Sequence, residues 1–293
     1  MDTPRPDFVT VDTNSYSLPI NGISGAERLI KNILINEPCV QLSNFEASAP
    51  VSFGYFNRNN SNFAFKEGVI IRTGNAKLSE GKYTGATISS IGSSQSDPDL
   101  DAINGNTQSR DRSFVKFDFV PTVESFSFNF LFSSNEYGQY QCAFGDTFAF
   151  ILTNLNDPTD VQNLAIVPGT TTRVSVVTVR DNAYNGGCGS VNAQFFDRFN
   201  QTGTGPNAGP ASSAINMRGQ TFSMVASANV IPNTPYRIKL VIADAIDTAF
   251  DSAVFLEAGS FNIGGPKITG TGAFFTDTDF TGPNAFCAGA PVV

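Results

Sequence analysis

The chain has 293 residues, a formal net charge of −8 and only 15% charged residues, and it contains neither His nor Trp. The absence of His excludes Ser-His-Asp and Cys-His nucleophilic catalysis and zinc sites built on imidazole. The acidic balance, without a Lys/Arg cluster, argues against a nucleic-acid partner, and no apolar run is long enough to span a bilayer.

The N-terminal region is predicted to contain one short helix. Residues 1–22 are polar and read as an extended segment. Ser24 and Glu27 have the spacing of a capping box, and apolar residues then recur on one helical face, at Leu29, Ile30, Ile33 and Leu34. We therefore expect a helix at about 25–35, ended by Pro38.

Short β segments separated by turn signals follow over most of the chain. They are Val40–Ala47, Ser52–Phe56, Val69–Thr73, Ala86–Ile91, Phe114–Val120, Phe126–Phe132, Thr147–Thr153, Ala165–Pro168, Val174–Val179, Gln220–Ala228, Tyr236–Ala243 and Val254–Ile263. This pattern predicts an all-β jelly-roll sandwich of two antiparallel sheets over residues 23–263. Residues 264–293 read as a linker and the start of a following domain.

Two of these segments, Phe126–Phe132 and Thr147–Thr153, carry Phe at alternate positions, as half-buried strands do. The loop that joins them begins with Glu136 and ends with Asp146. Polar loops on a rigid sheet are frequent binding sites.

Carboxylates collect at or near predicted strand ends, at Glu136, Asp146, Asp244, Asp247 and Asp251. If these strands are neighbours, the acids meet at one rim and supply the oxygen ligands that Ca²⁺ prefers, with Asn135, Tyr140 and Ser252 as supplements. The alternative is that the aspartates only cap turns. The acidic run from Asp97 to Asp101 lacks the Gly and Glu of an EF-hand loop, and we interpret it as an irregular acidic surface loop.

The four cysteines allow three pairings. Cys142 and Cys188 both lie in long predicted loops, and we favour a disulfide between them. Cys39 then either forms a disulfide with Cys287 or is a buried thiol. Alternatively, Cys287 forms a disulfide with a cysteine of another domain. An even Cys number and few Lys suit an extracellular setting, and we expect an exported protein whose signal peptide is not in this chain.

Tyr137, Tyr140 and Tyr184 fall in predicted loops, with Asn135 beside the first of them. Exposed rings in polar loops stack on sugars, but packing within the loop is the alternative reading.

Several motifs, in this order along the chain, resemble the choice-of-anchor L domain of secreted and surface proteins of Bacteroidota and other bacteria. They are GAERLIKNILINEPCVQLSNFEAS, GYFNRNNSNFAFKEGVIIRTGNA, SDPDLDAINGNTQSRDRSFVKFDFVP, FNFLFSSNEYGQYQCAFGDTFAFILT, NLAIVPGTTTRVSVVTV and YRIKLVIADAIDTAFDSAVFLEAGSF. The resemblance implies a lectin-like sandwich near the front of a multidomain adhesin, often type IX secreted and linked to gliding. The tail FCAGAPVV is similar to the opening strand of an Ig-like repeat. Family members often have Glu-Glu-Tyr where this chain has Asn135-Glu136-Tyr137.

Three functions compete. The first is a non-catalytic adhesion module, stabilised by Ca²⁺, that binds a glycan or a surface. The second is an assembly domain of a surface filament that binds a protein partner. The third, a glycoside hydrolase with two acids such as Glu136 and Asp251, has no residue that marks a proton donor, and we expect no enzyme.

Overall fold

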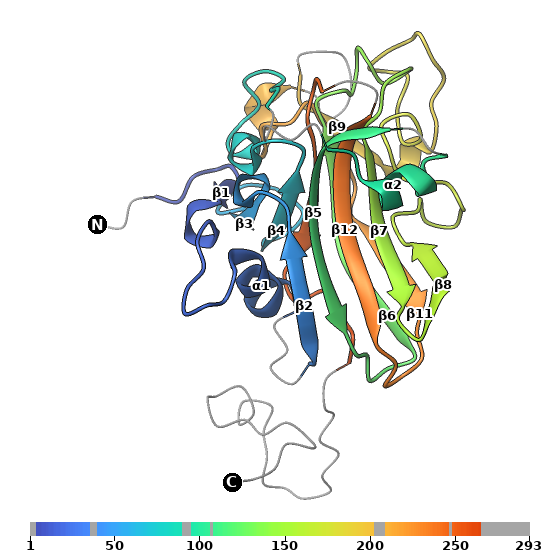
Figure 1. Cartoon of the computed structure of the whole chain (residues 1–293). Coiled ribbons are helices and arrows are strands. Elements are labelled where there is room, and N and C mark those ends of the chain that lie inside the picture. The colour runs from blue at the N-terminus through green and yellow to red at the C-terminus, as the bar shows by residue number, and fades with distance from the viewer. Residues whose placement is uncertain are drawn as a thin grey trace, which may run out of the picture.

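The computed structural model describes residues 4–35, 40–89, 95–105, 108–201, 209–245 and 248–264. Two antiparallel sheets pack face to face, which confirms the predicted all-β sandwich (Figure 1). The first sheet has the order β1 (Thr10–Asp12), β3 (Phe53–Asn57), β4 (Glu67–Arg72), β13 (Ser252–Glu257), β6 (Ser125–Ser134), β10 (Gly219–Thr221) and β9 (Phe196–Phe199), with β11 (Met224–Asn229) also on β6. The second has the order β2 (Leu42–Ala47), β5 (Ser109–Phe119), β12 (Tyr236–Ala245), β7 (Thr147–Asn154) and β8 (Asp157–Asn163).

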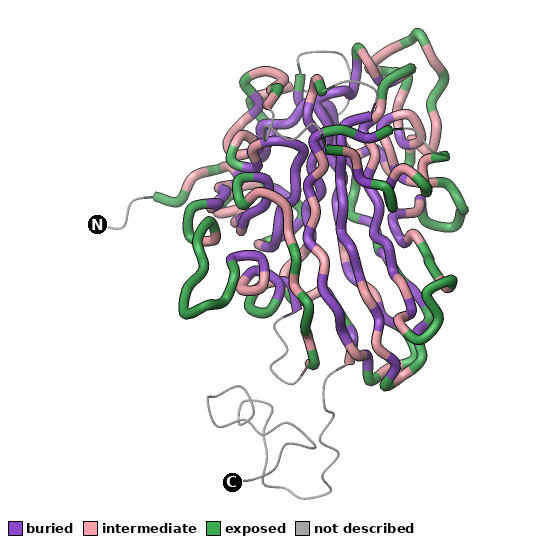
Figure 2. Tube along the Cα trace, viewed as in Figure 1, coloured by how far each residue is buried: buried purple, intermediate pink, exposed green. Residues whose placement is uncertain are grey.

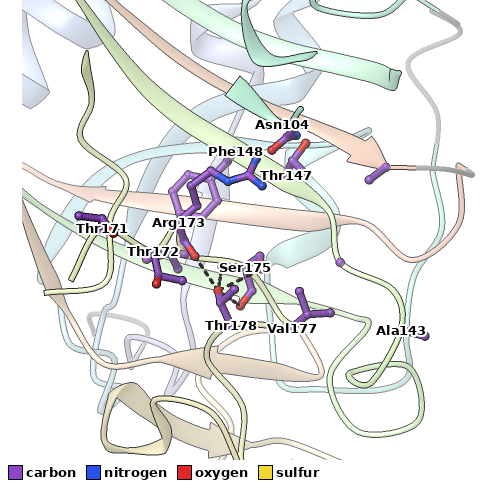
Figure 3. A pocket seen from close by; sticks show the side chains of 13 residues that line it. Asn104, Ala143, Thr147, Phe148, Thr171, Thr172, Arg173, Ser175, Val177 and Thr178 are labelled. Atoms are coloured by element: carbon purple, nitrogen blue, oxygen red, sulfur yellow. Dashed lines mark hydrogen bonds between the residues drawn. The ribbon is translucent and has the colours of Figure 1, made fainter. Parts of the chain in front are cut away.

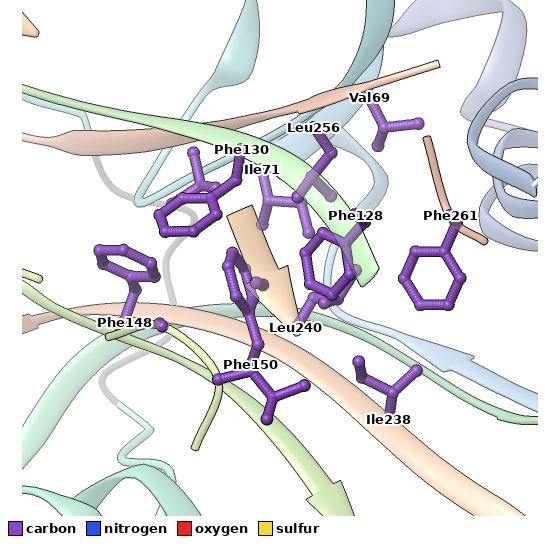
Figure 4. Close-up of a cluster of buried hydrophobic side chains, with 14 of the residues drawn as sticks. Val69, Ile71, Phe128, Phe130, Phe148, Phe150, Ile238, Leu240, Leu256 and Phe261 are labelled. Atoms are coloured by element: carbon purple, nitrogen blue, oxygen red, sulfur yellow. The ribbon is translucent and has the colours of Figure 1, made fainter. Parts of the chain in front are cut away.

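The core between the sheets is built from the inward-facing positions of the long strands. Phe128 and Phe130 of β6 meet Phe148 and Phe150 of β7, with ring centroids 4.9 to 5.9 Å apart (Figure 4). Side chains alternate across a strand, so the Phe pattern in the sequence places these rings on one face of each strand. The buried segments run along the middle of the long strands, and the exposed segments lie in the peripheral loops (Figure 2).

The N-terminal part of the chain contributes a strand to the sandwich. Thr10–Asp12, which belongs to the segment expected to be merely extended, pairs with β3 as the edge strand β1. The predicted helix is present as α1 (Gly25–Leu29) continued by a π-helical stretch η2 (Ile30–Ile35). The Ser24 side chain accepts a hydrogen bond from the Glu27 amide, as predicted, whereas the Glu27 carboxylate pairs with Lys31 at 2.7 Å.

The acidic run at 97–101 is a second helix, α2 (Pro98–Ile103), and the prediction of an irregular loop there is wrong. Asp97 caps its N-terminus by accepting from the Leu100 amide, and Pro98 takes the first helical turn, where a missing amide costs nothing. Lys239 of β12 holds both Asp97 and Asp99 at 2.7 Å. Helix α2 thereby covers the apolar outer face of the second sheet.

Short 3-10 turns occupy η1 (Asn14–Tyr16), η3 (Pro50–Ser52), η4 (Ala76–Ser79), η5 (Ala193–Phe195) and η6 (Pro210–Ser212). The strands expected at Ala165–Pro168 and Val174–Val179 are absent, since these residues form turns joined by one isolated bridge between Ile166 and Arg173.

Candidate functional site

At one end of the sandwich the inward-facing rows change from apolar to acidic. On β12, the inward positions run through Leu240 and Ile242 to Asp244, which is fully buried at 0% exposure. The register pairs Ala243 with Thr147, so Asp146, the residue before β7, lies opposite Asp244. Asp146 is also buried, at 1% exposure. Period-two alternation therefore continues past the aromatic core and places two carboxylates at its end.

Three further buried carboxylates belong to this acidic layer. Glu136 follows β6, Asp251 precedes β13, and Asp111 belongs to β5. Asp111 is not among the predicted ligands, because the sequence pattern predicts that this strand begins only at Phe114, whereas β5 begins at Ser109. The alternation of Val115 and Phe117, read back through the preceding residues, is the signal that assigns Asp111 to the inner face.

Asp251 is neutralised by a buried arginine. Arg72 Nη2 and Nε donate to Asp251 Oδ2 at 2.8 and 3.2 Å, and both side chains are 0% exposed. The amide and hydroxyl of Ser89 donate to the same carboxylate at 3.1 and 2.5 Å. Asp251 is thus fully used within the fold and holds β13 to the segment after β4.

Asp244 and Asp146 are less fully compensated, because the charge of Arg72 acts on them without an ion pair among the described residues. Among the described residues, neither carboxylate oxygen of Asp244 has a hydrogen-bond partner, and neither does Asp146 Oδ2. Burial raises the pKa of Asp244 to about 8; the nearby Thr73 hydroxyl opposes this, while the charges of Asp251, Asp111 and Glu136 add to it. The pKa of Asp146 is likewise raised well above its usual value, first by burial and then by Glu136 and Asp244.

Carboxylate oxygens, which are hard donors, therefore lie near one another here, but they do not all point at one common position. Within the described part of the chain, no three acidic or Cys side chains are arranged as a ready metal cage. Glu136 is engaged, since its Oε2 accepts from the Asp146 amide at 2.8 Å. Ser252 Oγ is a further buried atom with no hydrogen bond of 3.5 Å or shorter among the described residues, and it lies close enough to Asp146 to lower the pKa of that carboxyl. Asp247, the fifth predicted ligand, lies outside the described residues.

The aromatic candidates fall into two groups. Tyr137 is 0% exposed and packs on Phe196, so of the two interpretations packing holds for this ring and an exposed ligand-binding ring does not. Tyr140 and Tyr184 are half-buried and also contact other rings, Tyr140 with Phe250 at 4.7 Å.

Asn135, predicted to support binding, is fully buried. Its side chain donates to the carbonyl of Thr87 at 3.3 Å and accepts from the Arg218 amide at 3.0 Å. These contacts give Asn135 a role in joining three loops rather than in meeting a ligand.

The predicted disulfide between Cys142 and Cys188 is confirmed, with a Cα–Cα distance of 5.6 Å. It ties the loop between β6 and β7 to the turn before β9. Asn185 adds a bond from its side-chain amide to the Gly138 carbonyl at 2.8 Å. Cys39 and Cys287 lie outside the described residues.

Comparison with known proteins gives one match. Neither the curated protein sequences nor the solved structures contain a match to this chain. Among the described residues, no helix combines the length and the apolar character needed to cross a membrane. The family model of the choice-of-anchor L domain matches residues 11–262, which cover both sheets except for Thr10, the first residue of β1. Domains of this family are surface-associated or secreted modules and do not form an enzyme family. The chain therefore belongs to the choice-of-anchor L family.

Proposed function

We propose that this domain is a non-catalytic adhesion module, displayed on a bacterial cell surface at the front of a larger protein, and that Ca²⁺ stabilises its acidic end. Family membership supports the surface location. The absence of His from the sequence supports a binding rather than a catalytic role.

The observation that carries the Ca²⁺ proposal is the pair of unpartnered buried carboxylates. A buried ionised carboxylate without a close partner is costly, and Arg72 forms its ion pair with Asp251, so a proton or a bound cation would relieve Asp244 and Asp146. Ca²⁺ accepts carboxylates, hydroxyls and water in flexible geometry. Asp244 and Asp146 would supply the charge and Ser252 a hydroxyl oxygen, with Asp251 left to Arg72. The ion would neutralise the layer and fix the ends of β7, β12 and β13.

The binding surface that we propose is the group of loops above the acidic layer. The disulfide fixes the loop that carries Glu136, and half-buried Tyr140 and Tyr184 belong to the same group of loops. A glycan or another surface ligand suits such loops, because they are held in place before binding and carry rings and amides.

Calcium titration of chelator-stripped protein tests the metal. We expect millimolar Ca²⁺, but not Mg²⁺, to raise the melting temperature, because Mg²⁺ demands a stricter geometry than these donors offer. No shift with Ca²⁺ would refute the metal part. A glycan array with and without Ca²⁺ tests adhesion, and an array that is silent in both conditions would refute the glycan part.

One observation favours a second candidate, an assembly domain that binds a protein partner. Phe222, Val225 and Ile231 are 48%, 55% and 60% exposed, and they lie on or beside β11, whose pairing among the described residues is with β6 alone. Exposed apolar residues at such a strand suit pairing with another chain. Light scattering over a concentration series tests this, and a monomer at all concentrations would count against self-assembly.

A further inference from the structure

A pocket of about 380 Å³ lies at the start of β7 (Figure 3). Its walls come from the loop before β7, from the start of β7, from the end of α2 and from the turn at residues 171–178. Thr147 and Ala245, which directly follow Asp146 and Asp244 in the chain, both line it. The disulfide at Cys142 fixes the wall that Ala143 and Gly145 form.

The turn that carries Arg173 is held tightly. Thr178 Oγ1 donates to the Arg173 carbonyl at 2.6 Å, and the Ser175 amide donates to Thr178 Oγ1 at 2.8 Å. The Val174 amide donates to the Ala165 carbonyl at 3.0 Å. These bonds fix the backbone on both sides of Arg173, so its side chain leaves the turn in a set direction. Figure 3 shows the guanidinium reaching toward Asn104 and Thr147.

Arg173 is the one charged residue among the described residues that line the pocket. Its Nη1 is buried without a hydrogen-bond partner there, and the same holds for Thr147 Oγ1. It makes no ion pair with any described carboxylate, although the chain carries a net charge of −8. Buried polar groups are nearly always hydrogen-bonded, because an unpaired buried donor loses its hydrogen bonds to water and gains none in the protein. Both atoms therefore point to a ligand with acceptor oxygens.

We propose that this pocket binds one carboxylate-bearing sugar ring, as in a single uronic acid unit of an otherwise neutral glycan; this rests on the glycan-binding part of the proposed function. A guanidinium recognises a carboxylate through paired hydrogen bonds. The hydroxyls of Thr147, Thr171 and Thr172 are suited to sugar hydroxyls, and Val177 offers an apolar side. The volume is at the small end for ligand pockets, so it suits one ring rather than several.

The charge balance selects a carboxylate over a phosphate or sulfated chain. A single Arg meets a single negative charge, whereas polyanions are recognised by clusters of Lys and Arg. The pocket has no second cation among its described lining residues, and the net charge of −8 opposes the approach of a polyanion.

The test compares methyl β-glucuronide with methyl β-glucoside, which differ only by the carboxylate, by protein-observed NMR titration in millimolar Ca²⁺. We expect the glucuronide to bind at least about tenfold more tightly, as one charge-assisted hydrogen-bond pair implies. Arg173→Gln should abolish this preference and Arg173→Lys should keep part of it. Arg5→Gln, the same charge change at an exposed residue outside the pocket, should keep all of it. Melting curves must show that both Arg173 variants are folded.

Equal binding of the two glycosides by the wild type, or an unchanged preference in Arg173→Gln, would overturn the proposal. Repeating the glycan array with Arg173→Gln distinguishes a failure of the proposed pocket from a failure of the proposed adhesion function. Glycans bound equally by wild type and variant would leave the adhesion function standing and refute this pocket. An array on which the wild type binds nothing would refute both.

Discussion

Neutralising Asp244 is expected to stabilise the metal-free protein, contrary to the usual effect of a buried substitution. The fold raises the pKa of Asp244 from 3.8 to about 8. Between these values the folded state holds a proton that the unfolded state has lost, so the free energy of unfolding falls as pH rises through this window. Above it the ionised carboxylate costs roughly 5 to 6 kcal/mol, at about 1.4 kcal/mol for each pKa unit. Asp244→Asn removes this charge while nearly keeping the shape.

Urea unfolding in chelator, at several pH values from about 4 to about 9, measures the effect. We expect wild type and Asp244→Asn to have similar stability near the acid end of this range. The variant should become more stable as pH rises, by several kcal/mol at the alkaline end, because Asn does not ionise. The difference between the proteins is the quantity to follow, since the other titrating groups contribute to both. Asp160→Asn on the edge strand β8 makes the same chemical change and should give no such trend.

Calcium should narrow this difference between the wild type and the variant. At a hundredfold excess of free Ca²⁺ over its dissociation constant the wild type gains about 2.7 kcal/mol, and a variant without the ligand gains little. A variant that is less stable than the wild type at every pH in chelator would refute the assignment of Asp244 as an incompletely compensated charge. A Ca²⁺ response of the variant equal to that of the wild type would remove Asp244 from the metal site.

Three further predictions concern stability and are read from urea unfolding. Replacing Cys142 and Cys188 together by Ala should cost about 2 to 4 kcal/mol, because the disulfide closes a loop with a sequence separation of 46. Gly68→Ala should destabilise by about 2 kcal/mol or more, since the added methyl would lie 1.9 Å from a β13 carbonyl oxygen, and an unchanged midpoint would contradict that close approach. Arg72→Met should cost about 3 to 5 kcal/mol by leaving Asp251 unpaired, and adding Asp251→Asn should recover part of it.

The sandwich could be predicted because its evidence is local. Alternating Phe on Phe126–Phe132 and Thr147–Thr153 marks two half-buried strands regardless of what they pack against. The spacing of Ser24 and Glu27 likewise predicts where the helix begins. The two predictions that were wrong also had a local signal in the sequence. Asp97 and Pro98 are residue types typical of a helix start, and helix α2 begins there. Asp111 continues the alternation of β5 on the N-terminal side of the predicted strand.

The role of each carboxylate could not be predicted, because it depends on which charges lie nearby in space. Asp251 and Asp244 look alike in the sequence and are seven positions apart. Arg72, which is 179 positions away from Asp251 along the chain, forms an ion pair with Asp251 and none with Asp244. Burial then turns this difference into a shifted pKa for Asp244.

The sequence alone determined the class of fold, because strand periodicity is a pattern over a few residues. It indicated, without deciding, that acids meet at one end of the sandwich and that Cys142 pairs with Cys188. Only the tertiary structure decided that Tyr137 is core, that Asp244 and Asp146 are incompletely compensated and that Arg173 faces a pocket. Each of these is set by solvent exclusion and by contacts between segments far apart in the chain, and no local pattern records them.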